Sequence, residues 1–165
     1  MKNGNRSNDI RILLQIIDES YGKRAWHGTN LRGSIRGLTA KQASWRPAKG
    51  RHNIWEIVVH CAYWKYVVRR RLLGEKKGSF LLKGSNWFQR PAEPAEIVWR
   101  KDIQLLEETH QSLRKAVAAL KSPDLKKNPS NSKWTNVQTI SGIASHDLYH
   151  TGQIQLLKRL LKEKS

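Results

Sequence analysis

The segment HDLYHTGQIQLLKRLL, residues 146–161, carries the spacing that decides the fold of this 165-residue chain. Apolar residues and two histidines recur at intervals of three and four residues, at Ile143, His146, His150, Ile154 and Leu157. Intervals of this kind place side chains on one face of an α-helix. The segment therefore predicts a long helix over about residues 136–162, with both histidines on its apolar face.

Three further segments show helical spacing, at residues 8–22, 53–74 and 94–121. The second begins with Asn53 and Glu56, three residues apart, the pattern of a capping box. Pro94 is expected in the first turn of the third. A loop rich in glycine and proline, at about residues 75–94, separates the second segment from the third.

Short elements are expected between the first and second long helices, where Thr39 and Gln42 form another capping-box pattern. The chain has no convincing alternating strand, no internal repeat and no linker. Four long amphipathic segments predict an all-α fold, a four-helix bundle with short helices between helix 1 and helix 2. The whole chain, residues 1–165, is expected to form one domain.

The composition is strongly basic, with 31 Lys and Arg against 13 Asp and Glu and a net charge of +18. Such a surface attracts anions, so nucleic acid and acidic lipid are conceivable partners. The basic residues are dispersed, however, and no nucleic-acid-binding motif is present. We favour an ordinary solvated surface over nucleic-acid binding, and we place contact with an anionic membrane behind both.

The single cysteine, Cys61, cannot form an internal disulfide, which favours a reducing environment. The first nine residues lack the apolar centre of a signal peptide. No run of residues approaches the roughly 18 apolar residues of a membrane span. We therefore expect a cytoplasmic protein with no membrane span.

His146 and His150 are separated by one helical turn, a rise of about 6 Å and a rotation of about 40°. Two imidazoles in this arrangement can bind one metal ion. They can equally be two hydrogen-bonded histidines of the core, and the spacing alone favours the core interpretation.

His60 strengthens the metal interpretation, because it lies on the apolar stripe of a different long helix, between Ile57 and Trp64. A bundle can bring the inward faces of two helices together. Three histidines would leave coordination positions free, as in catalytic metal sites. The spacing does not show that the two helices face each other.

Two longer segments carry a family resemblance: AWHGTNLRGSIRGLTAKQASWRPAKGRHNIWEIVVHCAYWKYVVRRRLLGE and SGIASHDLYHTGQIQLLKRLL. With them the chain resembles the DinB/YfiT-like superfamily, in the branch that has a Trp-His-Gly segment near the N-terminus. The resemblance implies an up-down-down-up bundle. It also implies a divalent metal ion held by His60, His146 and His150, with zinc, nickel, iron and manganese all open as its identity.

The same resemblance implies an enzyme that acts on a small-molecule substrate. Relatives include thiol-dependent S-transferases, a maleylpyruvate isomerase and proteins described as metal-dependent hydrolases. A low-molecular-weight thiol as cosubstrate and a homodimer are therefore expected. Two departures argue against transferring a substrate: the charge of +18, and Thr29-Asn30 where relatives often have Pro-Ser after Trp-His-Gly.

Two further residues are candidates for the pocket. His27 lies near a loop and would line the pocket mouth or carry protons, although a structural hydrogen bond is the favoured alternative. Gln153, one turn beyond His150, would offer a hydrogen-bonding group.

Other polar and aromatic residues have simpler expected roles. Glu56 is expected to complete the cap at Asn53, and Asp147 to form a surface or inter-helix hydrogen bond. Cys61 is expected to be a small buried residue. His52 is expected in solvent or at a cap, and His110 at the margin of a helix face. Trp64 is expected nearest the metal, whereas Trp26 and Trp55 are pocket candidates for which core packing is the favoured alternative.

Two functions remain open at this level. The first is an enzyme in which a divalent ion activates a water, as in a hydrolase, or a thiol, as in an S-transferase. The second is a non-enzymatic basic bundle that binds nucleic acid or another anion and holds a structural metal.

Overall fold

A computed structural model describes residues 7–76, 78–129 and 132–164, and these residues form helices and loops without a strand. The elements in chain order are α1 (Asn8–Tyr21), α2 (Leu31–Ile35), α3 (Ala40–Ser44), α4 (Ile54–Leu72), α5 (Glu96–Ala118), the 3₁₀ helix η1 (Ser122–Lys126) and α6 (Asn136–Glu163). The predicted all-α class is therefore confirmed.

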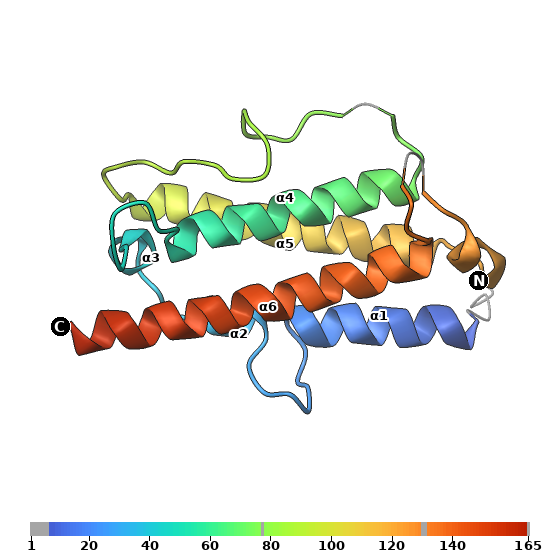
Figure 1. Ribbon diagram of the computed structural model, residues 1–165, viewed down its shortest axis with the longest axis horizontal. Coiled ribbons are helices and arrows are strands. Elements are labelled where there is room, and N and C mark those ends of the chain that lie inside the picture. Colours follow the sequence, from blue (N-terminus) through green and yellow to red (C-terminus); the bar gives the residue numbers. More distant parts are fainter. Residues whose placement is uncertain (1–6, 77, 130–131, 165) are drawn as a thin grey trace.

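The four long helices α1, α4, α5 and α6 lie lengthwise beside one another, and the short helices α2 and α3 connect α1 to α4 (Figure 1). Helices α1 and α6 run toward the left of Figure 1, whereas α4 and α5 run toward the right. Helix α4 packs against both α5 and α6. The two helices that carry the three sequence-predicted metal ligands are therefore neighbours.

Local side-chain hydrogen bonds explain where α4 begins. The Asn53 side chain accepts a hydrogen bond from the backbone N–H of Glu56 at 2.8 Å, and Glu56 accepts one from the backbone N–H of Asn53. This is the capping box expected from the sequence, and it pairs two backbone N–H groups that lack partners within the helix. The box predicted at Thr39 and Gln42 is also present, at the start of α3.

The start of α5 differs from the prediction. The N-cap residue Ala95 has an extended backbone and the helix begins at Glu96, so Pro94 precedes the helix instead of lying in its first turn.

Asn30, one of the two residues that depart from the family pattern, has a local role. Its side chain accepts a hydrogen bond from the backbone N–H of Gly33 at 2.9 Å and so caps α2.

The core consists of two apolar clusters, one centred on α4 and α5 and the other on α1 and α6. In the first cluster, Trp55 and Trp99 pack edge to face with ring centroids 5.3 Å apart, and both are fully buried. Trp55 therefore belongs to the core, the alternative that the sequence analysis favoured. Its indole N–H donates to Asp102 at 2.6 Å.

A long connection, whose described residues form no helix, follows α4 and runs along it back to the start of α5 (Figure 1). Arg90 attaches the connection to α5 through an ion pair with Asp102, at 2.6 Å. This connection supplies residues to the functional site. Among the described residues, no helix combines the length and the apolar character needed to cross a membrane.

Candidate metal centre

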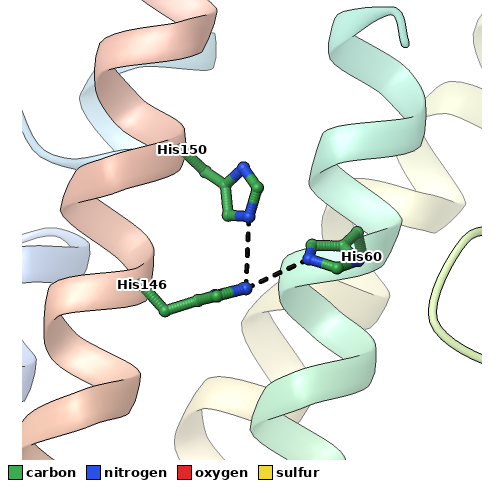
Figure 2. A group of neighbouring side chains, drawn as sticks. All are labelled: His60, His146 and His150. Carbon is green, nitrogen blue, oxygen red and sulfur yellow. Dashed lines mark hydrogen bonds between the residues drawn. The ribbon is translucent and has the colours of Figure 1, made fainter.

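Helices α4 and α6 bring together the three histidines predicted from the sequence. His60 projects from α4, and His146 and His150 project toward it from α6 (Figure 2). The Nε2 atom of His146 lies 3.0 Å from that of His60 and 3.1 Å from that of His150. Two nitrogens bound to one ion at about 2.1 Å lie roughly 3.0–3.4 Å apart for ordinary coordination angles. Both measured separations therefore match ligands to a single ion, and the candidate ligand atoms of all three histidines lie within 4.8 Å of one another.

Hydrogen bonds alone do not satisfy these three nitrogens. The Nδ1–H of His60 donates to the backbone oxygen of Asn86 at 2.8 Å, so in the neutral ring the Nε2 atom carries no hydrogen. His150 has the same arrangement, because its Nδ1 atom lies 2.7 Å from Oε1 of Gln153. Both Nε2 lone pairs face His146 Nε2, which carries at most one hydrogen. A cation between the rings accepts all three lone pairs, so the residues present fit a divalent metal ion.

Two residues outside the triad therefore orient two of its rings. Asn86 has a left-handed backbone conformation, with φ 64°, and its side-chain oxygen accepts a hydrogen bond from the Trp64 indole at 2.9 Å. The helical turn that separates Gln153 from His150 places an amide oxygen on the His150 Nδ1 atom. Contacts of this kind fix the ring tautomer and present Nε2 to a metal.

Burial keeps the three rings neutral. His60 and His150 are buried and His146 is half-buried. Removal from water lowers the pKa of His60 to about 4 and that of His146 to about 3, and it also lowers the pKa of His150. A metal binds the neutral imidazole. At neutral pH the rings are therefore in the ligating state without having to lose a proton.

A second group of ligand-type atoms also includes His146, because Cys61, His146 and Asp147 come within 4.8 Å of one another. Asp147 forms a fully buried ion pair with Lys65, which links α6 to α4. Burial raises the pKa of the Cys61 thiol well above its usual value, which disfavours the thiolate that would bind a metal. Of the two contacts expected for Asp147, on the surface or between helices, the structure shows the one between helices, and the buried position of Cys61 is confirmed.

Trp87 contacts the triad directly and was not among the residues predicted from the sequence. Its ring stacks on His60 with centroids 4.0 Å apart and on His52, from the other side, with centroids 3.6 Å apart. Trp64 was expected nearest to the metal, but its ring meets the His60 ring only edge to face, with centroids 6.4 Å apart. Trp87 lies in the connection before α5, where no helical period relates it to the histidines. Sequence spacing therefore carried no signal for it.

The other aromatic candidates are placed as follows. His27 and Trp26 are exposed in the loop before α2, and His27 is not part of the group of converging nitrogens found among the described residues. The role of His27 at a pocket stays a prediction. His52 is half-exposed, and its Nδ1 atom lies 3.0 Å from Glu56. His110 was expected at the margin of a helix face. It is instead buried and stacked on Tyr21 with centroids 3.7 Å apart, because α1 covers that side of α5.

The fold and the site together define a helical protein with a three-histidine group that could hold a metal ion. A family model described as the DinB superfamily matches residues 24–154, most of the chain and all three histidines. The chain belongs to the DinB superfamily, as its motifs predicted. Neither the search of the curated proteins nor the search of the solved structures found a match.

Proposed function

We propose that this chain is a metal-dependent enzyme whose divalent ion is held by His60, His146 and His150. The observation that carries the proposal is the convergence of three Nε2 atoms, 3.0 and 3.1 Å apart, from two different helices. Three protein ligands leave coordination positions free, which is the pattern of catalytic sites, whereas structural sites are usually closed. Membership of the DinB superfamily supports the same assignment of the metal site. The directions of the four long helices in Figure 1 agree with the up-down-down-up bundle that the family resemblance implies.

A divalent ion in this position would lower the pKa of a water or thiol, or polarise a substrate carbonyl or similar electrophile. The chain's own residues prepare the site for that chemistry. Asn86 and Gln153 hold two of the rings in the ligating tautomer, and Trp87 covers one face of His60. Water as the nucleophile makes the enzyme a hydrolase, and a low-molecular-weight thiol makes it an S-transferase.

Turnover assays distinguish these two reactions and test the proposal. A panel of low-molecular-weight thiols is assayed with monochlorobimane, which becomes fluorescent on thiol conjugation, and 4-nitrophenyl esters are assayed for hydrolysis. We expect one of the two activities in protein loaded with a divalent ion, and its loss after chelation and in His150→Ala. Activity that is unchanged in chelated protein and in His150→Ala would contradict a metal-dependent enzyme.

The net charge of +18 supports a second candidate, a basic module that binds nucleic acid around a structural metal. Binding of this kind depends on phosphate contacts and weakens steeply as salt rises. DNA binding that is salt-sensitive and survives chelation would favour the module over the enzyme.

A further inference from the structure

A cavity of about 460 Å³ lies between the second half of α6 and the segment that precedes α4, with Ile57 from the first turn of α4 in its wall. Its volume lies within the range of small-molecule sites. Its walls are mostly apolar, from Pro47, Ala48, Ile57, Leu156, Leu157 and Leu160. A cavity with these walls favours an apolar group of small-molecule size.

The cavity shares two residues with the metal centre. Trp87 lines it and also stacks on His60, at 4.0 Å between ring centroids. Gln153 lines it and also contacts His150 Nδ1 through its amide oxygen, at 2.7 Å. A ligand in the cavity therefore contacts the two side chains that lie directly against the ligand histidines.

The cavity wall contains basic residues but no acidic ones. Arg51 and His52 contribute to its wall, whereas no aspartate or glutamate does. Arg51 is exposed at the surface, and no carboxylate among the described residues pairs with its guanidinium. The carboxylate of Glu56, which lies beside His52, is held by Arg46. The Arg51 guanidinium at the apolar cavity therefore favours an anionic group on the ligand and disfavours a cationic one.

We propose that this cavity is the substrate site and that it takes an amphipathic organic anion. The apolar part of the substrate fills the space between α6 and the segment before α4, its anionic group pairs with Arg51, and its reacting end is directed past Trp87 and Gln153 to the triad. This proposal rests on the proposed function for the identity of the reacting centre, but the cavity itself is testable without the metal.

The test uses three molecules of the same shape and different charge: 4-phenylbutanoate, 4-phenylbutan-1-ol and 4-phenylbutylamine. Their binding to chelated protein is measured by isothermal titration calorimetry, so that the carboxylate has no metal to bind. We expect the acid to bind at least tenfold more tightly than the amine, with the alcohol between them. Equal affinities for the three, or no binding of the acid, would overturn the proposal.

Two variants locate the binding. Arg51→Gln should weaken acid binding about five- to tenfold, the loss of one charge-assisted contact, and leave alcohol binding nearly unchanged. Leu156→Asp should weaken binding of the acid and of the alcohol, because it puts a charge in the apolar wall. Leu156 is 58% exposed and Ile97, on α5 and outside the cavity, is 64% exposed, so Ile97→Asp is a matched control. Arg100→Gln, at an exposed position of α5, is the control for charge.

If acid binding is unchanged in Arg51→Gln, the anionic end has been assigned wrongly. If Leu156→Asp instead dissociates a dimer and the acid never binds, the apolar wall is an interface between two copies and the proposal fails. Both variants should still bind one metal ion per chain, so failure of the cavity is distinguishable from failure of the metal centre.

A second measurement tests whether the cavity leads to the centre. Protein loaded with Co²⁺ is titrated with 6-mercaptohexanoate and with 1-hexanethiol, and the thiolate-to-cobalt absorption band is followed. We expect 6-mercaptohexanoate to bind more tightly than 1-hexanethiol in the wild-type protein and the difference to disappear in Arg51→Gln. Absence of the band, while 4-phenylbutanoate still binds the chelated protein, would contradict the connection between the cavity and the triad.

Discussion

At His150, the orientation of one ring depends on the amide of a neighbouring side chain. The Gln153 oxygen lies 2.7 Å from His150 Nδ1, and the Gln153 nitrogen donates to the Tyr149 hydroxyl at 3.2 Å. His60 has a backbone oxygen in the corresponding position, that of Asn86. His146 has no such partner, because its Nδ1 atom is buried and makes no hydrogen bond in the structure. The rings of the three histidines are therefore oriented to different degrees.

Replacement of Gln153 tests this orientation. In Gln153→Ala the His150 Nδ1–H loses its acceptor, and we expect the affinity for Zn²⁺ to fall about 10- to 100-fold. Competition against a chromophoric chelator measures the change. Gln153→Glu keeps an acceptor oxygen and should bind Zn²⁺ at least as tightly as the wild type, and Gln155→Ala on the same helix is a neutral control. Unchanged affinity in Gln153→Ala would show that Gln153 does not position the ligand.

His110 gives the fold a pH dependence that is separate from the metal centre. Burial, together with the neighbouring cations Lys65, Arg114 and Arg32, lowers its pKa to about 3, although the carboxylate of Asp18 acts in the opposite direction. The unfolded chain gains a proton at this residue near pH 6.5, but the folded chain does not until about pH 3. The unfolded state therefore binds more protons between these two values, and stability falls as the pH falls.

We expect the free energy of unfolding to fall by about 2 kcal/mol between pH 7 and pH 5 because of His110. Below pH 6.5, where the unfolded chain is protonated at this residue and the folded chain is not, the fall is about 1.4 kcal/mol per pH unit. His110→Phe keeps the ring that stacks on Tyr21 but cannot be protonated. Its stability should depend less on pH by that amount, as measured by denaturant unfolding of chelated protein. A pH dependence equal to that of the wild type would show that His110 is already charged in the folded state.

At the level of the helices, α4 and α6 are joined by a buried charge pair as well as by the triad. Lys65 on α4 and Asp147 on α6 are each 1% exposed and form an ion pair. Removal of one partner leaves a buried charge without compensation, whereas replacement of both by apolar residues removes the cost of burying two charges. The pair therefore couples the two helices strongly without contributing much net stability.

A double-mutant cycle tests this coupling. Asp147→Leu and Lys65→Met should each lower the free energy of unfolding by about 3–5 kcal/mol. The double variant should recover most of that loss, as measured by urea unfolding of chelated protein. Losses that simply add in the double variant would contradict a direct pair between the two helices.

The start of α4 and the shared helix face of His146 and His150 were predictable because both follow local rules, whereas the start of α5 was not. Asn53 and Glu56 are close enough in sequence to cap α4 by themselves, and the spacing of His146 and His150 places both on one helix face. The contacts of Asn86 and Trp87 were not predictable, because they depend on the path of a long connection across α4. The burial of His110 was missed for a related reason, since it depends on which helix covers that face.

At the level of the whole molecule, the centre joins parts of the chain that are far apart in sequence. His60 and His146 are 86 positions apart, and their Nε2 atoms meet only when α4 packs on α6. An ion that binds all three ligands therefore binds the folded state far more tightly than the unfolded state. Metal binding must then stabilise the fold.

We expect free Zn²⁺ at 100 times its dissociation constant to raise the free energy of unfolding by about 2.7 kcal/mol. Thermal or urea unfolding with buffered Zn²⁺ measures this increase. His150→Ala should show little of it at the same concentration. An equal increase in the variant would indicate that the ion stabilises the protein from another site.

The most direct test of the three-histidine centre is the amount of divalent metal that the protein retains. Purified protein is equilibrated with Zn²⁺ or Ni²⁺, desalted and analysed for metal by mass spectrometry, with His150→Ala treated in parallel. The structure predicts one ion per chain in the wild type and almost none in the variant. A wild-type protein that retains no metal, or a variant that retains as much as the wild type, would contradict the assignment of His60, His146 and His150.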